Sequence, residues 1–353
     1  MSRLTDYVRM SVLSLAAALA IATPAKALLI SPGFDSTITG DVNAVQKETA
    51  INDAIAAIDA LYADAGTIRV LFKFDGSSGG ASSSNAITTV PYSSGSGYRA
   101  ALAADSTAHP NNTVLATALA GPALPASTPA SAANGIEVNV NLWRVALGAT
   151  GITPCFDTSG NFVGGCHATY DSVVTIGALN YASNGPSNNS QAVSVIEHEL
   201  DEVLGGGGAG STLNQSPVNV LGPLDLYRYQ ASGASCGSVT TIRSYTTNSS
   251  EVACLSFDGG TTSLVQMNQA GGGSDFGDFA NVGPLKIQDA FTSGGDVIQT
   301  YTTVSPEYQM TLSIGYDPRT SVSAPEPATV ILFSAALATL GLARRRGRTA
   351  QGE

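Results

Sequence analysis

Apolar residues recur at helical spacing near the middle of this 353-residue chain. At about 100° per residue, the apolar side chains between positions 192 and 203 fall on one face of a helix. They are Ala192, Val195, Ile196, Leu200 and Val203. We expect the helix to end in the run of four glycines at 205–208. Glu199 lies within the apolar face, where an unpaired carboxylate costs several kcal/mol, so this helix is the first candidate for a functional site.

Hydrophobic spacing also predicts the elements before this helix. Alternating polarity indicates strands, recurrence at helical intervals indicates helices, and Ser- and Gly-rich stretches indicate loops. We expect a helix at 43–65, a strand at 67–74, a loop or weak hairpin at 76–97, short helices at 98–104 and 112–119, and a pair of strands at 136–147 and 172–179. Asn112 or Thr113 is expected to cap the second short helix.

The chain after the central helix is rich in Gly, Ser, Thr and Asn, with short strand patterns at 240–245, 252–257 and 263–267. No segment repeats with a period of about 20 to 50 residues, which argues against a solenoid or a propeller. The predicted fold class is therefore α+β, with helices toward the front and β-strands or coil toward the back.

A targeting pattern occupies the N-terminus. Arg3 and Arg9 precede an apolar run at 10–22, and the tripeptide Ala-Lys-Ala at 25–27 has the small-x-small form of a signal-peptidase site. Residues 1–27 are therefore predicted to be a secretory signal peptide, and they are left out of fold reasoning.

A second targeting pattern occupies the C-terminus, at 321–353. The tripeptide Pro-Glu-Pro at 325–327 precedes an uncharged apolar segment at 328–343 and an arginine cluster at 344–348. This tail resembles the PEP-CTERM sorting signal of Gram-negative bacteria. The resemblance implies recognition by an exosortase, membrane contact through the apolar segment before processing, and delivery to the cell envelope, the cell surface or the extracellular matrix. A plain C-terminal membrane anchor is the alternative, and it also places the body outside the cytoplasm.

The charge of the body limits its partners. Between residues 28 and 324 there are nine Lys and Arg residues and 24 Asp and Glu residues, a net charge of −15. Such a balance argues against nucleic acid and anionic lipid as partners, and it suits a hard cation.

The four cysteines form two local pairs. Cys155 lies near Cys166, and Cys236 lies near Cys254. In an exported protein this spacing predicts two disulfides that close short loops. A cysteine-based zinc site would have tighter C-x-x-C spacing.

The central helix carries part of a zinc-peptidase motif. In those enzymes two histidines one helical turn apart bind the metal, and the glutamate after the first histidine activates the metal-bound water. His198 and Glu199 stand at the first two positions, and Glu202 replaces the second histidine. A carboxylate also binds zinc, at about 2.0–2.2 Å, but it makes the site harder and opens it to other divalent ions.

Several blocks from the helix onward stand in a characteristic order. They cover residues 198–205, 223–229, 257–260, 272–279, 288–291 and 314–316. The series resembles a family of secreted bacterial PEP-CTERM proteins classed as metalloproteases, which is in turn similar to metzincins. Gly205 stands where a metzincin chain turns toward its third metal ligand, but Gly208 occupies the place of that ligand. The third ligand must therefore come from elsewhere in the chain.

The resemblance implies a zincin-like domain over residues 28–320. In it, the active-site helix packs on a small mixed sheet, and a Gly-, Ser- and Asp-rich region of β-strands and coil follows. Zn²⁺ would be held by His198, Glu202 and a third ligand, for which Asp225 is the first candidate and His167 the alternative.

Each candidate also has an ordinary structural role, which the sequence leaves open. Glu199 is the candidate general base, and its alternative is a buried salt bridge with Arg144 or Arg228. The alternative for Asp225 is an edge-strand aspartate that holds Arg228. Glu202 has the alternative of a solvated acidic helix face.

The remaining histidine and two tyrosines carry weaker predictions. His109 precedes a proline in a polar turn and is expected to be exposed. Tyr227 and Tyr229 are candidates to stabilise an oxyanion, with aromatic packing as the alternative role.

A group of aspartates separated by glycines is a candidate calcium site, because Ca²⁺ binds six to eight oxygens. The group comprises Asp275, Asp278, Asp289 and Asp296. No EF-hand spacing or nonapeptide repeat accompanies them, and the alternative is a glycine-rich turn with solvated aspartates.

The sequence thus predicts a secreted or cell-surface, metal-dependent endopeptidase that acts on a protein or peptide substrate through a metal-activated water. The alternative is a non-catalytic envelope or extracellular-matrix protein with a degenerate metal site. Bound metal and proteolysis, measured beside the Glu199→Gln variant, distinguish the two.

Overall fold

The structure is a computed structural model that describes residues 27–76, 80–177, 190–213, 219–269, 275–291 and 301–319. All but the last residue of the predicted signal peptide lies outside these ranges, as do the predicted tail and Asp296. No helix within these ranges is long and apolar enough to cross a membrane.

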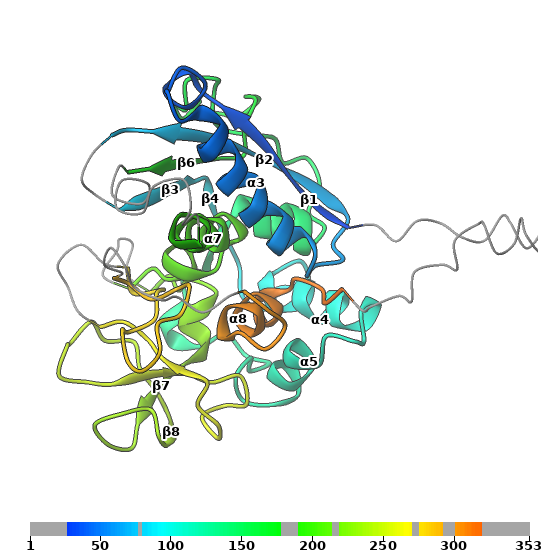
Figure 1. Ribbon diagram of the computed structural model, residues 1–353. Coiled ribbons are helices and arrows are strands. Elements are labelled where there is room, and N and C mark those ends of the chain that lie inside the picture. Colours follow the sequence, from blue (N-terminus) through cyan, green and yellow to red (C-terminus); the bar gives the residue numbers. More distant parts are fainter. Residues whose placement is uncertain are drawn as a thin grey trace, which may run out of the picture. The chain divides into compact units, whose positions relative to one another are not determined.

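A mixed four-stranded sheet forms the upper layer in Figure 1, in the order β1-β2-β6-β3. The strands are β1 (Leu28–Phe34), β2 (Gly66–Phe74), β6 (Ser172–Ile176) and β3 (Ala81–Asn85). The first three run parallel, and β3 pairs antiparallel with β6 at the edge. Ile68, Val70 and Phe72 alternate into the core, which confirms the strand predicted at 67–74.

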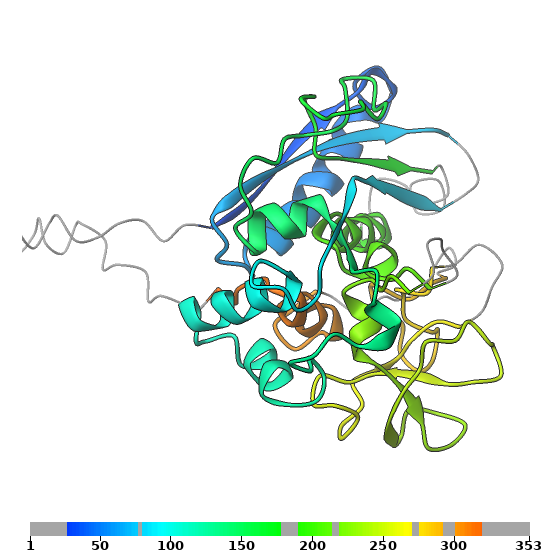
Figure 2. The same cartoon turned by 180° about the vertical axis from the view of Figure 1, so that it is seen from behind.

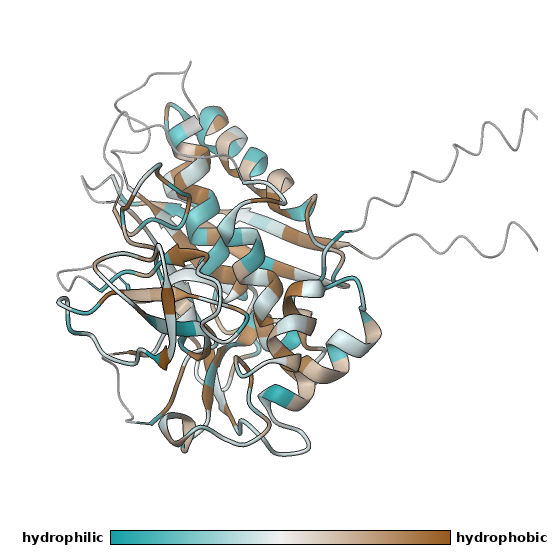
Figure 3. Ribbon diagram, turned by 90° about the horizontal axis from the view of Figure 1, so that it is seen from below, coloured by the Kyte–Doolittle hydropathy of each residue, from teal (hydrophilic) through white to brown (hydrophobic). Residues whose placement is uncertain are grey.

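Helices pack against this sheet and against one another. Short helix α2 (Ser36–Thr39) contacts β1 and β2, α3 (Ala44–Asp59) contacts β1, and α7 (Ser190–Leu204) contacts β3, β6 and α3. Bands of hydrophobic and hydrophilic residues alternate along the helices (Figure 3). The helix predicted at 43–65 is shorter than expected, because it ends at Asp59 and Gly66 already belongs to β2.

A separate antiparallel sheet follows α7, in the order β10-β9-β7-β8. Its strands are β7 (Arg228–Ala231), β8 (Val239–Arg243), β9 (Ala253–Leu255) and β10 (Val265–Gln266). These strands confirm the three short strands predicted behind the central helix. The fold class is therefore α+β, as predicted.

Both predicted disulfides are present. Cys155 is bonded to Cys166, and Cys236 is bonded to Cys254 in β9. Disulfides form and persist in oxidising compartments, so the two bonds indicate such an environment for the body of the protein.

Strands are present within both predicted ranges, 136–147 and 172–179, but they do not pair with each other. The first strand, β5 (Ile136–Asn139), is short and pairs with β4 (Ile87–Val90), whereas β6 belongs to the main sheet. The chain after β5 forms a π-helical turn, Leu142–Ala146. Alternating polarity indicated a strand with one buried face, but it did not identify the strand's partner.

The segment at 76–97 is not a hairpin. It contributes β3 and β4, which pair with different strands and in different sheets. Three of the five residues of β3 are serines, and this polar composition is why the sequence indicated a loop.

Three helices lie beside one another away from the main sheet (Figure 2). They are α4 (Tyr98–Ala108), α5 (Thr113–Ala120) and α8 (Pro306–Ile314). The first two were predicted, and the Asn112 side chain caps α5 by accepting from the Leu115 amide at 3.0 Å. Helix α8 was not predicted and corrects the expectation of strands or coil at the back of the chain. It is buried around most of its circumference, so it lacks an amphipathic period.

Candidate metal centre

Helix α7 buries the predicted apolar face, whose five residues are each at most 9% exposed. Its end is fixed by two asparagines, one at the end of β5 and one just after it. Asn139 donates to the carbonyl of Glu202, and Asn141 donates to that of Val203, both at 3.0 Å. These amides satisfy carbonyls that a helix end leaves without partners. Gly205 then turns the chain with a φ of 91°, a conformation that favours glycine.

His198 presents one ring nitrogen to a group of carboxylates. Its Nδ1–H donates to the carbonyl oxygen of Ile287 at 2.9 Å, which leaves Nε2 as the ring nitrogen that faces the carboxylates. Nε2 lies 3.7 Å from Glu202 Oε1 and 3.9 Å from Asp278 Oδ1. A metal-binding histidine typically donates its other ring N–H to a carbonyl or carboxylate, as His198 does here.

The three side chains fit a divalent cation. One ligand atom from each of His198, Glu202 and Asp278 lies within 4.8 Å of the others. Ligands of a tetrahedral zinc with bonds of about 2.0–2.1 Å stand about 3.3–3.4 Å apart, only a few tenths of an ångström closer than the distances observed. Ser83 in β3 donates to the second oxygen of Glu202 at 2.6 Å and so orients the first.

Glu199 lies beside this group as a buried carboxylate. The residue is 4% exposed, and its Oε2 has no hydrogen-bond partner among the described residues. Burial, together with the charges of Glu202, Asp278 and Asp275, raises the pKa of Glu199 well above its usual range, although His198 opposes the shift. A buried, unpartnered carboxylate is costly, so its position is more consistent with a functional site than with packing.

The predicted alternative partners of Glu199 are engaged elsewhere. Arg144 pairs with Asp171 at 2.8 Å. Arg228 is fully buried and donates to the carbonyl oxygens of Phe276 and Asn268.

The pKa values of His198 and Asp278 depend on their burial and on the charges of the side chains around them. Burial disfavours the charged imidazole of His198, but the interaction with Glu202 and the charges of Asp278 and Glu199 outweigh it, so the pKa lies well above its usual value. Burial raises the pKa of Asp278 to about 7, against the lowering effect of His198. A bound cation would supply the positive charge that protons on His198 and Asp278 supply in its absence.

Gln288 connects two members of the group. Its Nε2 donates to Asp278 Oδ1 at 2.9 Å and lies 3.2 Å from His198 Nε2. Its Oε1 is buried without a partner among the described residues. The amide nitrogen therefore takes a position between two candidate ligands, and it would have to move when a cation binds.

Glycines let the backbone approach these side chains closely. In the 3-10 turn Gly207–Gly210, a Cβ at Gly207 would overlap the amide of Gln288. A Cβ at Gly208 would overlap Asp275 and lie 2.5 Å from Glu202 Oε1. The glycine run thus does more than end α7, because it forms one wall of the group.

The predicted third ligand, Asp225, is not brought to His198. Its carboxylate accepts from Ser211 Oγ at 2.6 Å, from the Thr212 amide at 2.9 Å and from the Gly222 amide at 2.8 Å. The charge of Arg228 also acts on it. Asp225 therefore fixes a loop, and the position expected for it is taken by Asp278.

Sequence reasoning placed Asp278 only among the calcium candidates and gave Gln288 no role. The two residues fall within the blocks at 272–279 and 288–291, which are the only sequence signals that mark them. Of the other calcium candidates, Asp275 faces Glu202 across Gly208, and Asp289 accepts from the Lys286 amide at 2.9 Å.

The remaining candidates lie apart from the group. His167 is exposed in the first disulfide loop, with a φ of 96°. Tyr227 is buried, donates to the Ser313 carbonyl at 2.6 Å and packs edge-on against Phe257, which favours the packing role. His109 is exposed, as predicted, and it also contacts two carboxylates.

Comparison of the chain with protein-family models, with curated proteins and with solved structures gave no match. The function has to be argued from the residues of the site.

Proposed function

We propose that the protein is a zinc-dependent metallopeptidase with His198, Glu202 and Asp278 as metal ligands and Glu199 as general base. One observation carries the proposal. The second ring nitrogen of an oriented imidazole lies 3.7 and 3.9 Å from oxygens of two buried carboxylates, and a third carboxylate with an unpartnered oxygen lies beside them. The packing of α7 on a small mixed sheet supports the zincin-like arrangement that the resemblance implies.

Each side chain has a distinct task in this reaction. A bound cation would acidify a water molecule and polarise the scissile carbonyl. Glu199 takes the proton of the attacking water at Oε2 and passes it to the departing amine. Burial and the neighbouring carboxylates raise the pKa of Glu199, which makes it a stronger base toward the attacking water. The Ile287 carbonyl holds the His198 ring, and Ser83 holds Glu202.

The edge strand β3 supports a peptide as substrate. Among the described strands, β3 pairs on one side only, with β6, and it packs against α7. An extended peptide can add to such an edge through its main-chain hydrogen bonds. Because Ser83 contacts Glu202, a peptide on this edge would bring its carbonyls to the candidate ligands.

Export belongs to the same proposal. The N-terminal signal peptide and the PEP-CTERM tail support delivery to the cell envelope, surface or extracellular matrix, with the exosortase machinery as a partner. The alternative function, a non-catalytic envelope or matrix protein, is favoured by Gln288, whose amide already links Asp278 and His198.

The test measures bound zinc and casein cleavage by the purified full chain. Glu199→Gln is expected to keep zinc and lose cleavage by roughly 100-fold or more, since it removes the general base. His198→Ala and Asp278→Asn are each expected to lose one equivalent of zinc as well. Glu197→Gln is the matched control, because it makes the same substitution at a second buried glutamate on α7, 3% exposed, that faces Glu307 rather than the group.

The outcomes separate the two functions. Zinc with cleavage that Glu199→Gln abolishes and Glu197→Gln preserves supports the peptidase. Zinc that is lost in His198→Ala, without cleavage by the wild type, supports the non-catalytic alternative. A zinc stoichiometry that neither His198→Ala nor Asp278→Asn lowers overturns the proposed ligand set.

A further inference from the structure

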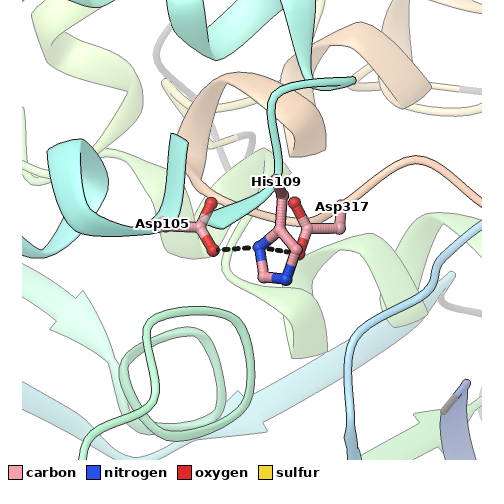
Figure 4. A group of neighbouring side chains, drawn as sticks. All are labelled: Asp105, His109 and Asp317. Carbon is pink, nitrogen blue, oxygen red and sulfur yellow. Dashed lines mark hydrogen bonds and ion pairs between the residues drawn. The ribbon is translucent and has the colours of Figure 1, made fainter. Parts of the chain in front are cut away.

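A second histidine lies between two carboxylates where α4 ends (Figure 4). Asp105 belongs to the last turns of α4, His109 follows that helix directly, and Asp317 comes after α8. Nδ1 of His109 is 2.9 Å from Asp105 Oδ1 and 2.5 Å from Asp317 Oδ2. The three candidate ligand atoms all lie within 4.8 Å of one another.

The two carboxylates are buried but incompletely bonded. Their side chains are 6% and 5% exposed, whereas the imidazole of His109 is 50% exposed. Asp105 Oδ2 and Asp317 Oδ1 have no hydrogen-bond partner among the described residues. One ring nitrogen carries at most one proton, so His109 cannot donate a full hydrogen bond to both carboxylates through Nδ1. The group therefore has more buried acceptors than donors.

A third carboxylate increases this imbalance. Asp64 is 4% exposed and accepts from the Asp317 amide at 3.0 Å. Burial, with the charges of its neighbours, raises the pKa of Asp317 to about 8 and that of Asp64 to about 7. His109 forms ion pairs with two of these aspartates, Asp105 and Asp317.

We propose that Asp105, His109 and Asp317 form a second metal site, for a divalent cation of the Zn²⁺ type. One imidazole nitrogen and two carboxylate oxygens are a donor set that zinc accepts. Both oxygens lie closer to Nδ1 than the roughly 3.3–3.4 Å between zinc ligands, so they would move outward when a cation binds. The buried carboxylates supply the negative charge, and the half-exposed imidazole lies at the entrance from solvent. The i, i+4 spacing of Asp105 and His109 places both on one side of the helix end, as in known metal motifs.

The site would have a structural role. Asp105 and His109 come from α4, whereas Asp317 comes from the end of the body, so a cation would join segments that are distant in sequence. The Asp317 backbone already bonds to residues after α3, through Asp64 and the Ala63 amide. A cation here would act as a cross-link that stabilises the folded state by mass action.

A protonated His109 that forms ion pairs with both carboxylates, without metal, is the competing explanation. The two explanations differ in the effect of His109→Lys. A lysine keeps a positive charge near Asp105 and Asp317, so the ion-pair explanation predicts little change in stability. It cannot bind a cation at neutral pH, because the protonated amine offers no lone pair.

The experiment uses the full chain carrying His198→Ala, so that the centre on α7 does not contribute. The protein is treated with EDTA, dialysed and titrated with Zn²⁺ alone, with Ca²⁺ in a parallel titration. We expect one equivalent of Zn²⁺ to bind and to raise the melting temperature. Adding His109→Lys should weaken Zn²⁺ binding roughly 10-fold or more and abolish the thermal shift, while the metal-free protein stays folded.

Zn²⁺ binding unchanged by His109→Lys, or no Zn²⁺ binding to the His198→Ala protein, overturns the proposal. Asp317→Asn serves as a second variant. It removes a ligand charge without changing side-chain volume, and it should weaken Zn²⁺ binding by a similar factor. These outcomes do not depend on the proposed peptidase activity, because the readouts are stoichiometry and melting temperature.

Discussion

Two buried glutamates two positions apart on α7 have different environments. Glu199 faces the candidate ligands, and three neighbouring carboxylates help to raise its pKa. Glu197 faces Glu307, and burial together with that charge raises its pKa to about 8. At neutral pH, Glu197 is therefore largely protonated, and replacing it with glutamine changes little in charge. This is the reason it serves as a control for the substitution of Glu199.

The same shift predicts how Glu197 affects stability. Its pKa in the folded state is raised above the unfolded value of 4.5, so folding favours the neutral acid. The contribution is complete below pH 4.5 and is lost as the pH rises through about 8. We expect Glu197→Gln to be more stable than the wild type by about 1–3 kcal/mol at high pH. The difference should be small at acidic pH.

Urea unfolding at a series of pH values measures this difference. The variant should have a flatter dependence of the unfolding free energy on pH between neutral and alkaline conditions. A wild type and variant that lose stability in parallel with rising pH would show that Glu197 is not the group that titrates.

At the scale of elements, two asparagines fix the end of α7, although the sequence pattern would place them on a solvent-facing side of a strand. Asn139 and Asn141 alternate with the apolar residues of 136–147, yet both are buried, and they bond to the last carbonyls of α7. Asn141 also donates to Ser172 in β6 at 2.8 Å. The end of the helix is thereby linked to the main sheet.

Asn141→Ala should therefore destabilise the protein by about 1–3 kcal/mol, because it leaves buried partners without a donor. It should also weaken zinc binding, since the carbonyl it holds comes directly after Glu202. The free energy of unfolding and the zinc affinity measure the two effects. Asn111→Ala, at an exposed position near α5, is the control and should change neither. Equal stability of both variants would contradict the argument.

The elements that sequence reasoning found are those with a local signal. The period of α7, its glycine stop and the cap of α5 depend on neighbouring residues, and the structure has all three. Strand pairing depends on tertiary contacts, so the partner of β5 could not be predicted. Helix α8 has few polar residues on its surface to define a face, and it went undetected.

The part of the candidate site that lies on α7 could also be predicted from local sequence, and the part that comes from distant segments could not. His198, Glu199 and Glu202 lie on one helix, and their spacing alone predicts that they are neighbours. Asp278 and Gln288 come from segments after β10, about 80 to 90 residues along the chain from His198. No local sequence pattern shows that residues so far apart are in contact. For the same reason Asp225, which follows the helix more closely in sequence, was the expected ligand.

At the scale of the whole molecule, the group around His198 draws on both sheets. Ser83 and α7 belong with the main sheet, whereas Asp278 follows β10 of the second. Asn268 joins that strand to the group, because its amide donates to the Asp278 carbonyl at 2.8 Å and its side chain donates to the Asp275 carbonyl at 2.9 Å. Arg228 in β7 donates to the carbonyls of Phe276 and Asn268 and so fixes the same segment.

The two disulfides should therefore differ in their effect on metal binding. Cys254 pairs with Tyr229 of β7 and with Gln266 of β10, so its bond to Cys236 braces the sheet that positions Asp278. The bond between Cys155 and Cys166 closes a loop on another part of the chain. Their sequence separations, 18 and 11 residues, are similar enough that loop entropy assigns each about 3 kcal/mol of stability.

Replacing either cysteine pair with serines should lower the unfolding free energy by a similar amount, about 3 kcal/mol in the loop-entropy account. Only the loss of the Cys236–Cys254 bond should also weaken zinc binding at His198, because only that bond holds the sheet from which Asp278 is reached. Zinc titration in a His109→Lys background isolates the centre on α7, and urea unfolding gives the stabilities. A Cys155–Cys166 replacement that weakens zinc equally would mean that general loss of stability, and not the position of Asp278, controls affinity.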